Sequence, residues 1–127
     1  MPLGISDTQV ESVTILHLKG TLVAGSDTDL LGSRVEALLK KGVTRILLDL
    51  GEVNYIDSSG IGALIRAYSS AQSQNAALKL FRLTRRVHDV LQITRLSTVF
   101  EIFNDQGKAI ASFGEKAESS ERSAQGG

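Results

Sequence analysis

Hydrophobic residues along the chain recur with two different periods, and the periods alternate from one segment to the next. Residues 3–9 and 12–20 have the character of strands, and the second is apolar on both sides, as in a strand covered on two faces. The short connection between them favours a hairpin. Residues 43–50, 76–83 and 98–103 are further apolar runs that predict strands.

The first segment with a helical period covers residues 26–42 and carries signals at both ends. Ser26 is a candidate N-cap, and Asp29 three residues later completes the form of a capping box. Gly42 suits the left-handed conformation in which many helices end. The apolar stripe consists of Leu31, Val35, Leu38 and Leu39.

Three more helices are predicted. One follows the motif DSSGIG, one covers residues 84–96 with Thr84 as N-cap, and a short one covers residues 104–113 with Asn104 or Asp105 as cap. The apolar stripes are Ile61, Leu64, Ile65 and Tyr68 in the first of these and Val87, Val90, Leu91 and Thr94 in the second.

Strands that alternate with helices predict an α/β fold. We expect a mixed, mostly parallel sheet of about five strands with an opening hairpin, flanked by about four helices. Residues 1–113 form the expected domain. Residues 114–127 have no apolar side chain larger than alanine, so we expect a disordered C-terminal tail there.

Composition narrows the possible functions. The 127 residues are 42% hydrophobic, which suits one domain with a core, and 14 basic residues balance 14 acidic ones. This balance argues against nucleic-acid binding. The chain has no cysteine, which excludes disulfides and thiolate sites. Neither a secretory signal nor a run of about 20 apolar residues is visible, so we expect a cytoplasmic protein.

The motif DSSGIG at residues 57–62 is the main candidate for chemistry. Asp57, Ser58 or Ser59 can cap the helix that begins there. The positive end of a helix also suits a phosphate, so one serine can cap while its neighbour accepts a phosphoryl group. Gly60 and Gly62 allow close packing at the helix start and leave it open to an approaching partner.

A catalytic role for these serines is disfavoured. A nucleophilic serine needs a base, and neither His17, within a predicted strand, nor His88, within a helix, has the sequence context of a triad. Asp27 and Asp29 are explained by helix capping, and no cluster has the spacing of metal ligands. We therefore expect a protein that is not an enzyme and has no metal and no cofactor.

Three arginines, Arg82, Arg85 and Arg86, lie near the start of the third helix. Such a charge run is either a solvated face or a docking patch for an acidic partner surface, and the sequence leaves both interpretations open.

The segment YIDSSGIGALIRAY, preceded by RILLDLGEV, resembles the signature of bacterial anti-sigma factor antagonists, single-domain members of the STAS group. LGISDTQVESVTILHLKGTL resembles their opening hairpin, and VHDVLQITRLSTVFEIF resembles their third helix and last strand. The likeness covers residues 3–112.

The resemblance implies a function in transcription regulation and signal transduction. Antagonists of this family bind an anti-sigma factor that is also a serine kinase with a histidine-kinase-like ATPase fold, and they thereby release the sigma factor. The kinase phosphorylates the serine that matches Ser58, while Ser59 matches a second, usually unmodified serine. A PP2C-type phosphatase reverses the modification. The implied partner interface comprises Asp57, Ser58, Ser59, Gly60, Ile61, Gly62 and Val23.

The resemblance departs from the family pattern after the second strand. Thr21 and Val23 stand where acidic residues that contribute to kinase recognition are frequent, and the nearest acids, Asp27 and Asp29, come later. One alternative is therefore a STAS scaffold, or an accessory subunit of a signalling complex or lipid transporter, without a phospho-switch. A phosphoaspartyl receiver domain is a further alternative, but the chain lacks its acidic pair after the first strand.

Overall fold

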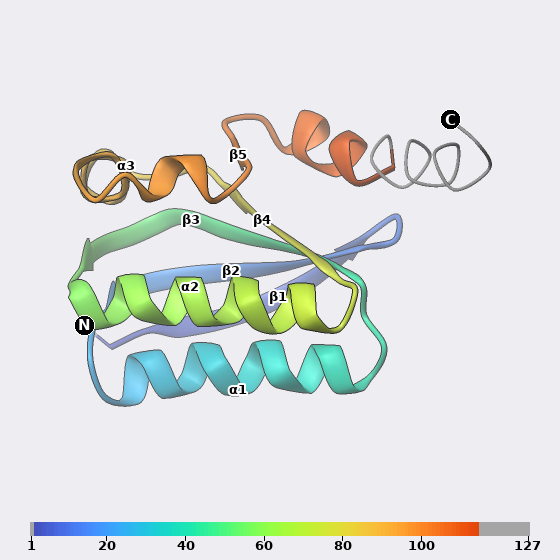
Figure 1. Cartoon of the computed structure of the whole chain (residues 1–127), viewed down its shortest axis with the longest axis horizontal. Coiled ribbons are helices and arrows are strands. Elements are labelled where there is room, and N and C mark those ends of the chain that lie inside the picture. The colour runs from blue at the N-terminus through green and yellow to red at the C-terminus, as the bar shows by residue number, and fades with distance from the viewer. Residues whose placement is uncertain (1, 115–127) are drawn as a thin grey trace.

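The computed structural model describes residues 2–114, which fold around one five-stranded sheet (Figure 1). The strands lie in chain order: β1 (Gly4–Val10), β2 (Val13–Leu22), β3 (Arg45–Ile56), β4 (Ala77–Phe81) and β5 (Ile102–Phe103). β1 runs antiparallel to β2, and the other neighbours are parallel. The predicted mixed α/β sheet with an opening hairpin is confirmed.

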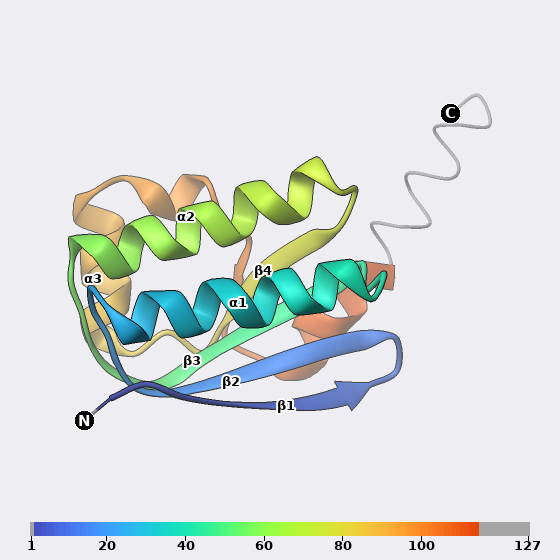
Figure 2. The ribbon, with the colours of Figure 1, turned by 90° about the horizontal axis from the view of Figure 1, so that it is seen from below.

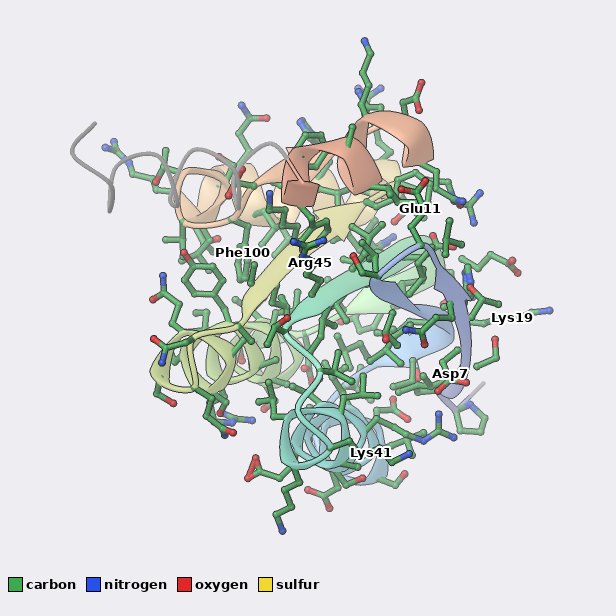
Figure 3. The ribbon with its side chains drawn as sticks, turned by 90° about the vertical axis from the view of Figure 1, so that its right-hand side faces the viewer. Asp7, Glu11, Lys19, Lys41, Arg45 and Phe100 are labelled. Atoms are coloured by element: carbon green, nitrogen blue, oxygen red, sulfur yellow. The ribbon has the colours of Figure 1, made fainter. Side chains whose placement is uncertain are left out.

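The helices form layers on both sides of this sheet. They are α1 (Ser26–Lys40), α2 (Ser58–Ser73), α3 (Arg85–Ile93) and an unlabelled helix over residues 106–114, here called the C-terminal helix. α1 and α2 lie side by side (Figure 2), while the C-terminal helix lies across the sheet from α1 (Figure 3). The tail predicted over residues 114–127 lies outside the described residues, except for Gly114 in this helix.

Alternating residues of the central strands feed two hydrophobic cores. Leu16, Leu48 and Leu80 belong to the larger core with α1, α2 and α3. Ile15 and Leu47 point to the opposite face, where they pack in a smaller core with Ala109, Ile110 and Phe113 of the C-terminal helix. Burial on both faces explains why β2 and β3 read as almost continuous apolar runs.

The helix stripes agree closely with the predicted ones. All four stripe residues of α1 are buried, and in α2 Ile61 and Leu64 are buried while Ile65 and Tyr68 pack against the larger core. In α3, Val87 and Leu91 are buried and Thr84 is the N-cap, as predicted. Val90 is half-buried and packs against the larger core. The fourth stripe residue, Thr94, is exposed at the C-cap, and its hydroxyl donates to the Val90 carbonyl.

The predicted capping box at the start of α1 is wrong. Gly25 is the N-cap, and the helix has no side-chain cap. Ser26 is already the first helical residue, and Asp29 donates its backbone N–H to the Gly25 carbonyl at 3.1 Å. Gly25 has a φ of 105°, which glycine adopts readily. The chain therefore turns into the helix at Gly25, one residue before the predicted cap.

The last strand is much shorter than predicted. Leu96–Thr98 form a 3₁₀ helix, and only Ile102–Phe103 pair with β4. Phe100 turns into the larger core, where its ring lies edge-on to that of Tyr68 at 5.3 Å. This burial withdraws the middle of the apolar run from sheet pairing. Asp105, one of the two predicted caps, accepts from Lys108 N at 3.2 Å and begins the C-terminal helix.

Candidate functional site

The motif DSSGIG lies where the long strand β3 passes into α2. Asp57 is the N-cap, with extended backbone, and its Oδ1 accepts from the backbone N–H of Gly60 at 2.8 Å. Because the aspartate performs the capping, the two serines do not have to. Ser58 and Ser59 are the first two residues of α2, and both are exposed.

The second half of the motif sets the position of α2. Gly60 is buried, and a Cβ atom on it would overlap the carbonyl oxygen of Leu22 at the end of β2. Ile61 is buried in the larger core, and Gly62 is half-buried with only the side-chain end of Arg66 near it. Gly60 therefore serves close packing, as predicted. It is buried, so the further expectation that it leaves the helix start open to a partner is wrong.

The loop between β2 and α1 lies against this motif. The Ala24 N–H donates to Asp57 Oδ2 at 3.2 Å, so Asp57 joins the loop to the start of α2. Val23, half-buried in the same loop, donates its N–H to Asp27 Oδ2 at 3.1 Å. The structure thus brings Val23 to the motif, as the predicted interface required, and places no acid at that position.

Asp27 does not replace the missing acid, because it is buried and occupied. Besides Val23, it accepts from the Leu3 N–H at 2.9 Å and from the Thr21 hydroxyl at 2.7 Å. Burial raises the pKa of this carboxyl, but the three hydrogen bonds outweigh burial and hold the pKa below its usual value. Asp29 is the exposed acid of the pair.

The three arginines after β4 do not form one patch. Arg82 bonds Asp49 through Nε at 3.0 Å and Nη2 at 3.2 Å, while Arg85 lies 3.7 Å from Asp89 within α3. The Arg86 guanidinium lies 5.3 Å from the centre of the Tyr55 ring, just before the motif. Arg85 and Arg86 are exposed, and Arg82 belongs to a separate network.

The network joins Thr8, His17, Asp49 and Arg82, and it was not predicted from the sequence. The Thr8 hydroxyl lies 2.9 Å from His17 Nε2, and His17 Nδ1 lies 2.7 Å from Asp49 Oδ2. Burial raises the pKa of Asp49, but the hydrogen bonds from Arg82, His17 and the Gly51 N–H hold it below the usual value. The same pair raises the pKa of Arg82. A histidine and an aspartate in otherwise apolar strand runs were the available signal.

Two negative findings apply to the described part of the chain. Within residues 2–114, no three acidic or histidine side chains are grouped so that they could hold a metal ion. No helix in that range combines the length and apolar character needed to cross a membrane.

Comparisons with known proteins concern the fold and the family. Residues 5–109 match the family model described as "STAS domain". An anti-sigma-B factor antagonist of Listeria monocytogenes is 37% identical over 70 residues, which are 55% of this chain and 60% of the relative. The match therefore spans less than two thirds of that relative's length.

Solved structures extend the likeness to most of the chain. A Thermotoga maritima protein, provisionally described as an anti-sigma factor antagonist, has a TM-score of 0.78 and 26% identity over 85% of this chain and 92% of its own. The Bacillus cell fate determinant SpoIIAA in its phosphorylated form has a TM-score of 0.66 over 87% of this chain and 98% of its own. At 15% identity, this second likeness concerns the fold alone.

Proposed function

This chain belongs to the STAS-domain family, and on that premise we propose that it is an anti-sigma factor antagonist. It binds an anti-sigma factor that is also a serine kinase, releases the sigma factor, and acts in the cytoplasm. Antagonists of this family are non-enzymatic regulators, which agrees with the expectation that the chain is not an enzyme.

The observation that carries the proposal is the exposure of the serine pair beside a completed cap. Asp57 satisfies the Gly60 N–H, so the Ser58 hydroxyl is left for a partner or a kinase. The proposed interface consists of the motif and the adjoining loop at Val23. Gly60 and Ile61 are buried and hold the helix start in place, and the other members make contact with the partner. The full interface comprises Asp57, Ser58, Ser59, Gly60, Ile61, Gly62 and Val23.

Phosphorylation of Ser58 turns the proposed interaction off. A phosphoserine carries about −1.5 to −2 charges at neutral pH, which would stand beside the Asp57 carboxylate. Burying that dianion in an interface without paired cations costs free energy, and each 1.4 kcal/mol lost weakens binding about tenfold. The partner kinase supplies ATP and Mg²⁺, and a PP2C-type phosphatase restores the free serine.

Recognition by the kinase has to work without an acid at position 23. Asp27 is buried, so the other carboxylates available near the motif are those of exposed Asp29 and half-buried Asp57. The absence of an acid is also the observation that favours the second candidate function, a STAS scaffold or accessory subunit of a signalling complex or lipid transporter. Such a subunit would use the same surface without the phospho-switch.

Calorimetry with a cognate kinase-type anti-sigma factor tests the proposal. We expect Ser58→Ala to bind like the unmodified chain and Ser58→Asp to bind at least about tenfold more weakly. Ser59→Asp places the same charge one residue further along the interface, so it should weaken binding less than Ser58→Asp if the switch is specific to Ser58. Equal binding of Ser58→Asp and Ser58→Ala would contradict the switch.

The modified residue can be identified directly. After incubation with the kinase and ATP, mass spectrometry should find phosphate on Ser58. Phosphate on Ser59 would reassign the site, and tight binding without phosphorylation of either serine would favour the scaffold role.

A further inference from the structure

The sheet face that carries the C-terminal helix changes character halfway along the strands. Ile15 and Leu47 lie under that helix, whereas His17 and Asp49, two residues further on, lie on the same face beyond it. A shallow basin of about 330 Å³ occupies this open half. The basin lies over β1, β2, β3 and the end of β4. The polar residues that line it are Ser6, His17, Lys19, Asp49, Glu52 and Arg82.

The hydrogen-bond partners of the two ring nitrogens determine the tautomer of His17. Asp49 is an ionised carboxylate and therefore an acceptor, so the proton of the imidazole lies on Nδ1, 2.7 Å from Oδ2. In the neutral ring, Nε2 then carries the lone pair, which accepts from the exposed Thr8 hydroxyl at 2.9 Å. The side chain of His17 is 32% exposed and lines the basin.

Asp49 itself is held rigidly. It is 5% exposed and accepts from the Gly51 N–H at 3.0 Å as well as from Arg82. Arg82 has a φ of 58°, a costly conformation for a residue with a side chain, and a Cβ on Gly51 would overlap its guanidinium. A side chain at position 51 would push this guanidinium aside, so Gly51 leaves room for the cation over Asp49.

We propose that His17 Nε2 is a phosphoryl-accepting nitrogen for donors of the phosphoramidate or acyl phosphate class. Asp49 is the positioning residue, because it fixes the proton on Nδ1 and balances the positive charge of the phosphorylated ring. Lys19 lines the same basin and provides a cation for the phosphoryl oxygens, whereas Arg82 is bonded to Asp49. The Lys19 ion pair with Glu52 is long, at 3.7 Å, and exposed, so Lys19 is free to turn to a ligand.

With phosphoramidate as donor, the step is balanced within these groups. The hydrogen bond between Nε2 and the Thr8 hydroxyl breaks, and the Nε2 lone pair forms a nitrogen–phosphorus bond. Phosphoramidate reacts as its zwitterion, in which the nitrogen already carries three protons. Its phosphorus–nitrogen bond breaks, and the electron pair of that bond leaves on nitrogen as ammonia. The Nδ1 proton stays between the ring and Asp49. This site is independent of Ser58 and lies on a different part of the fold.

The chain contains its own control, because His17 and His88 are its only histidines. His88 is exposed on α3, and the carboxylate nearest to it belongs to exposed Asp89, at 3.4 Å. The full chain is incubated with potassium phosphoramidate, and labelling of each histidine is followed by ³¹P NMR and mass spectrometry. We expect an acid-labile phosphate on His17 to form at least about tenfold faster than on His88.

Variants separate the chemistry from the folding. Lys19→Met, at an exposed position, should slow labelling of His17 relative to His88 by about threefold or more, and Asp49→Asn should remove most of the difference. Thr8→Val should retain the label on His17, since only the displaced hydroxyl is lost. The proposal is overturned if His88 reacts as fast as His17, or if the phosphate is acid-stable and located on Thr8.

Discussion

Gly60 in α2 packs directly against the backbone carbonyl of Leu22 at the end of β2. The same carbonyl lies 3.4 Å from the Asp57 backbone nitrogen, which donates to it. The end of one strand thus determines both where the loop after β3 turns and how closely α2 approaches the sheet. The serines are exposed because the two residues on either side of them are fixed in this way.

Gly60→Ala should therefore destabilise the protein. The added methyl group meets backbone that cannot move independently, and overpacking of this kind costs about 1–3 kcal/mol. Gly62→Ala is the matched control, since its Cβ would meet only the flexible end of Arg66 at 3.2 Å. Urea unfolding checks both variants. Similar stability of the two would mean that α2 shifts freely on the sheet.

Asp57 and Ser58 should differ in their effect on stability, because Asp57 caps α2 and Ser58 does not. Asp57→Ala leaves the Gly60 N–H without its acceptor and should lower the free energy of unfolding by about 0.5–2 kcal/mol. Ser58→Ala should change it by less than about 0.5 kcal/mol, because Ser58 is exposed and does not cap. Thermal unfolding followed by circular dichroism measures both. A large loss in Ser58→Ala would show that the serine has a structural role.

Local patterns in the sequence predicted the parts of the fold that depend on local chemistry. The stripe of Leu31 and Val35 follows from the helical period alone, and Thr84 could be identified as a cap from its neighbours. The predicted cap at Ser26 failed because Gly25 makes the turn one residue earlier. The motif offered three candidate caps, and only the fold shows that Asp57 takes this role.

Contacts between distant strands could not be predicted in the same way. The network of Thr8, His17, Asp49 and Arg82 depends on the register of three strand pairs and on an irregularity between β2 and β3 just after His17. A shift by one residue would send each of these side chains to the other face. The burial of Asp27 likewise depends on the N-terminal segment, 24 residues away at Leu3.

Asp27 should make stability depend on pH in the acid range. Its pKa is lower in the folded state than the usual value of about 3.9, so the folded protein favours the carboxylate. That stabilisation is complete above about pH 4–5 and is lost as the pH falls through the folded-state pKa. The free energy of unfolding, measured by urea titration from pH 7 to pH 2.5, should decrease accordingly.

Substitution identifies the Asp27 share of this acid loss. Asp27→Asn should cost about 1–3 kcal/mol at pH 7, because an amide cannot accept all three hydrogen bonds, and much less at pH 2.5. Asp29→Asn, on the exposed side of the same helix turn, should stay within about 0.5 kcal/mol at both values. An unchanged pH dependence in Asp27→Asn would assign the acid loss to Asp49, whose pKa is also lowered.

Lys79 should anchor the C-terminal helix to the sheet. This lysine is 1% exposed, donates to Ser112 Oγ at 2.8 Å, and lies 3.5 Å from Glu101 Oε1 and 4.5 Å from the centre of the Phe113 ring. Lys79→Ala removes the charge and the packed stem together, and should cost about 2–4 kcal/mol. Lys79→Met keeps most of the packing and should cost clearly less.

Hydrogen exchange locates this effect. In Lys79→Ala, amides of residues 106–114 should exchange faster, while those of α1 and α2 stay protected, because the two cores lie on opposite faces of the sheet. Equal loss of protection on both faces would show that the smaller core does not unfold on its own. Faster exchange confined to residues 106–114 would show that the C-terminal helix opens locally. Such opening uncovers Ile15 and Leu47, which pack beneath that helix.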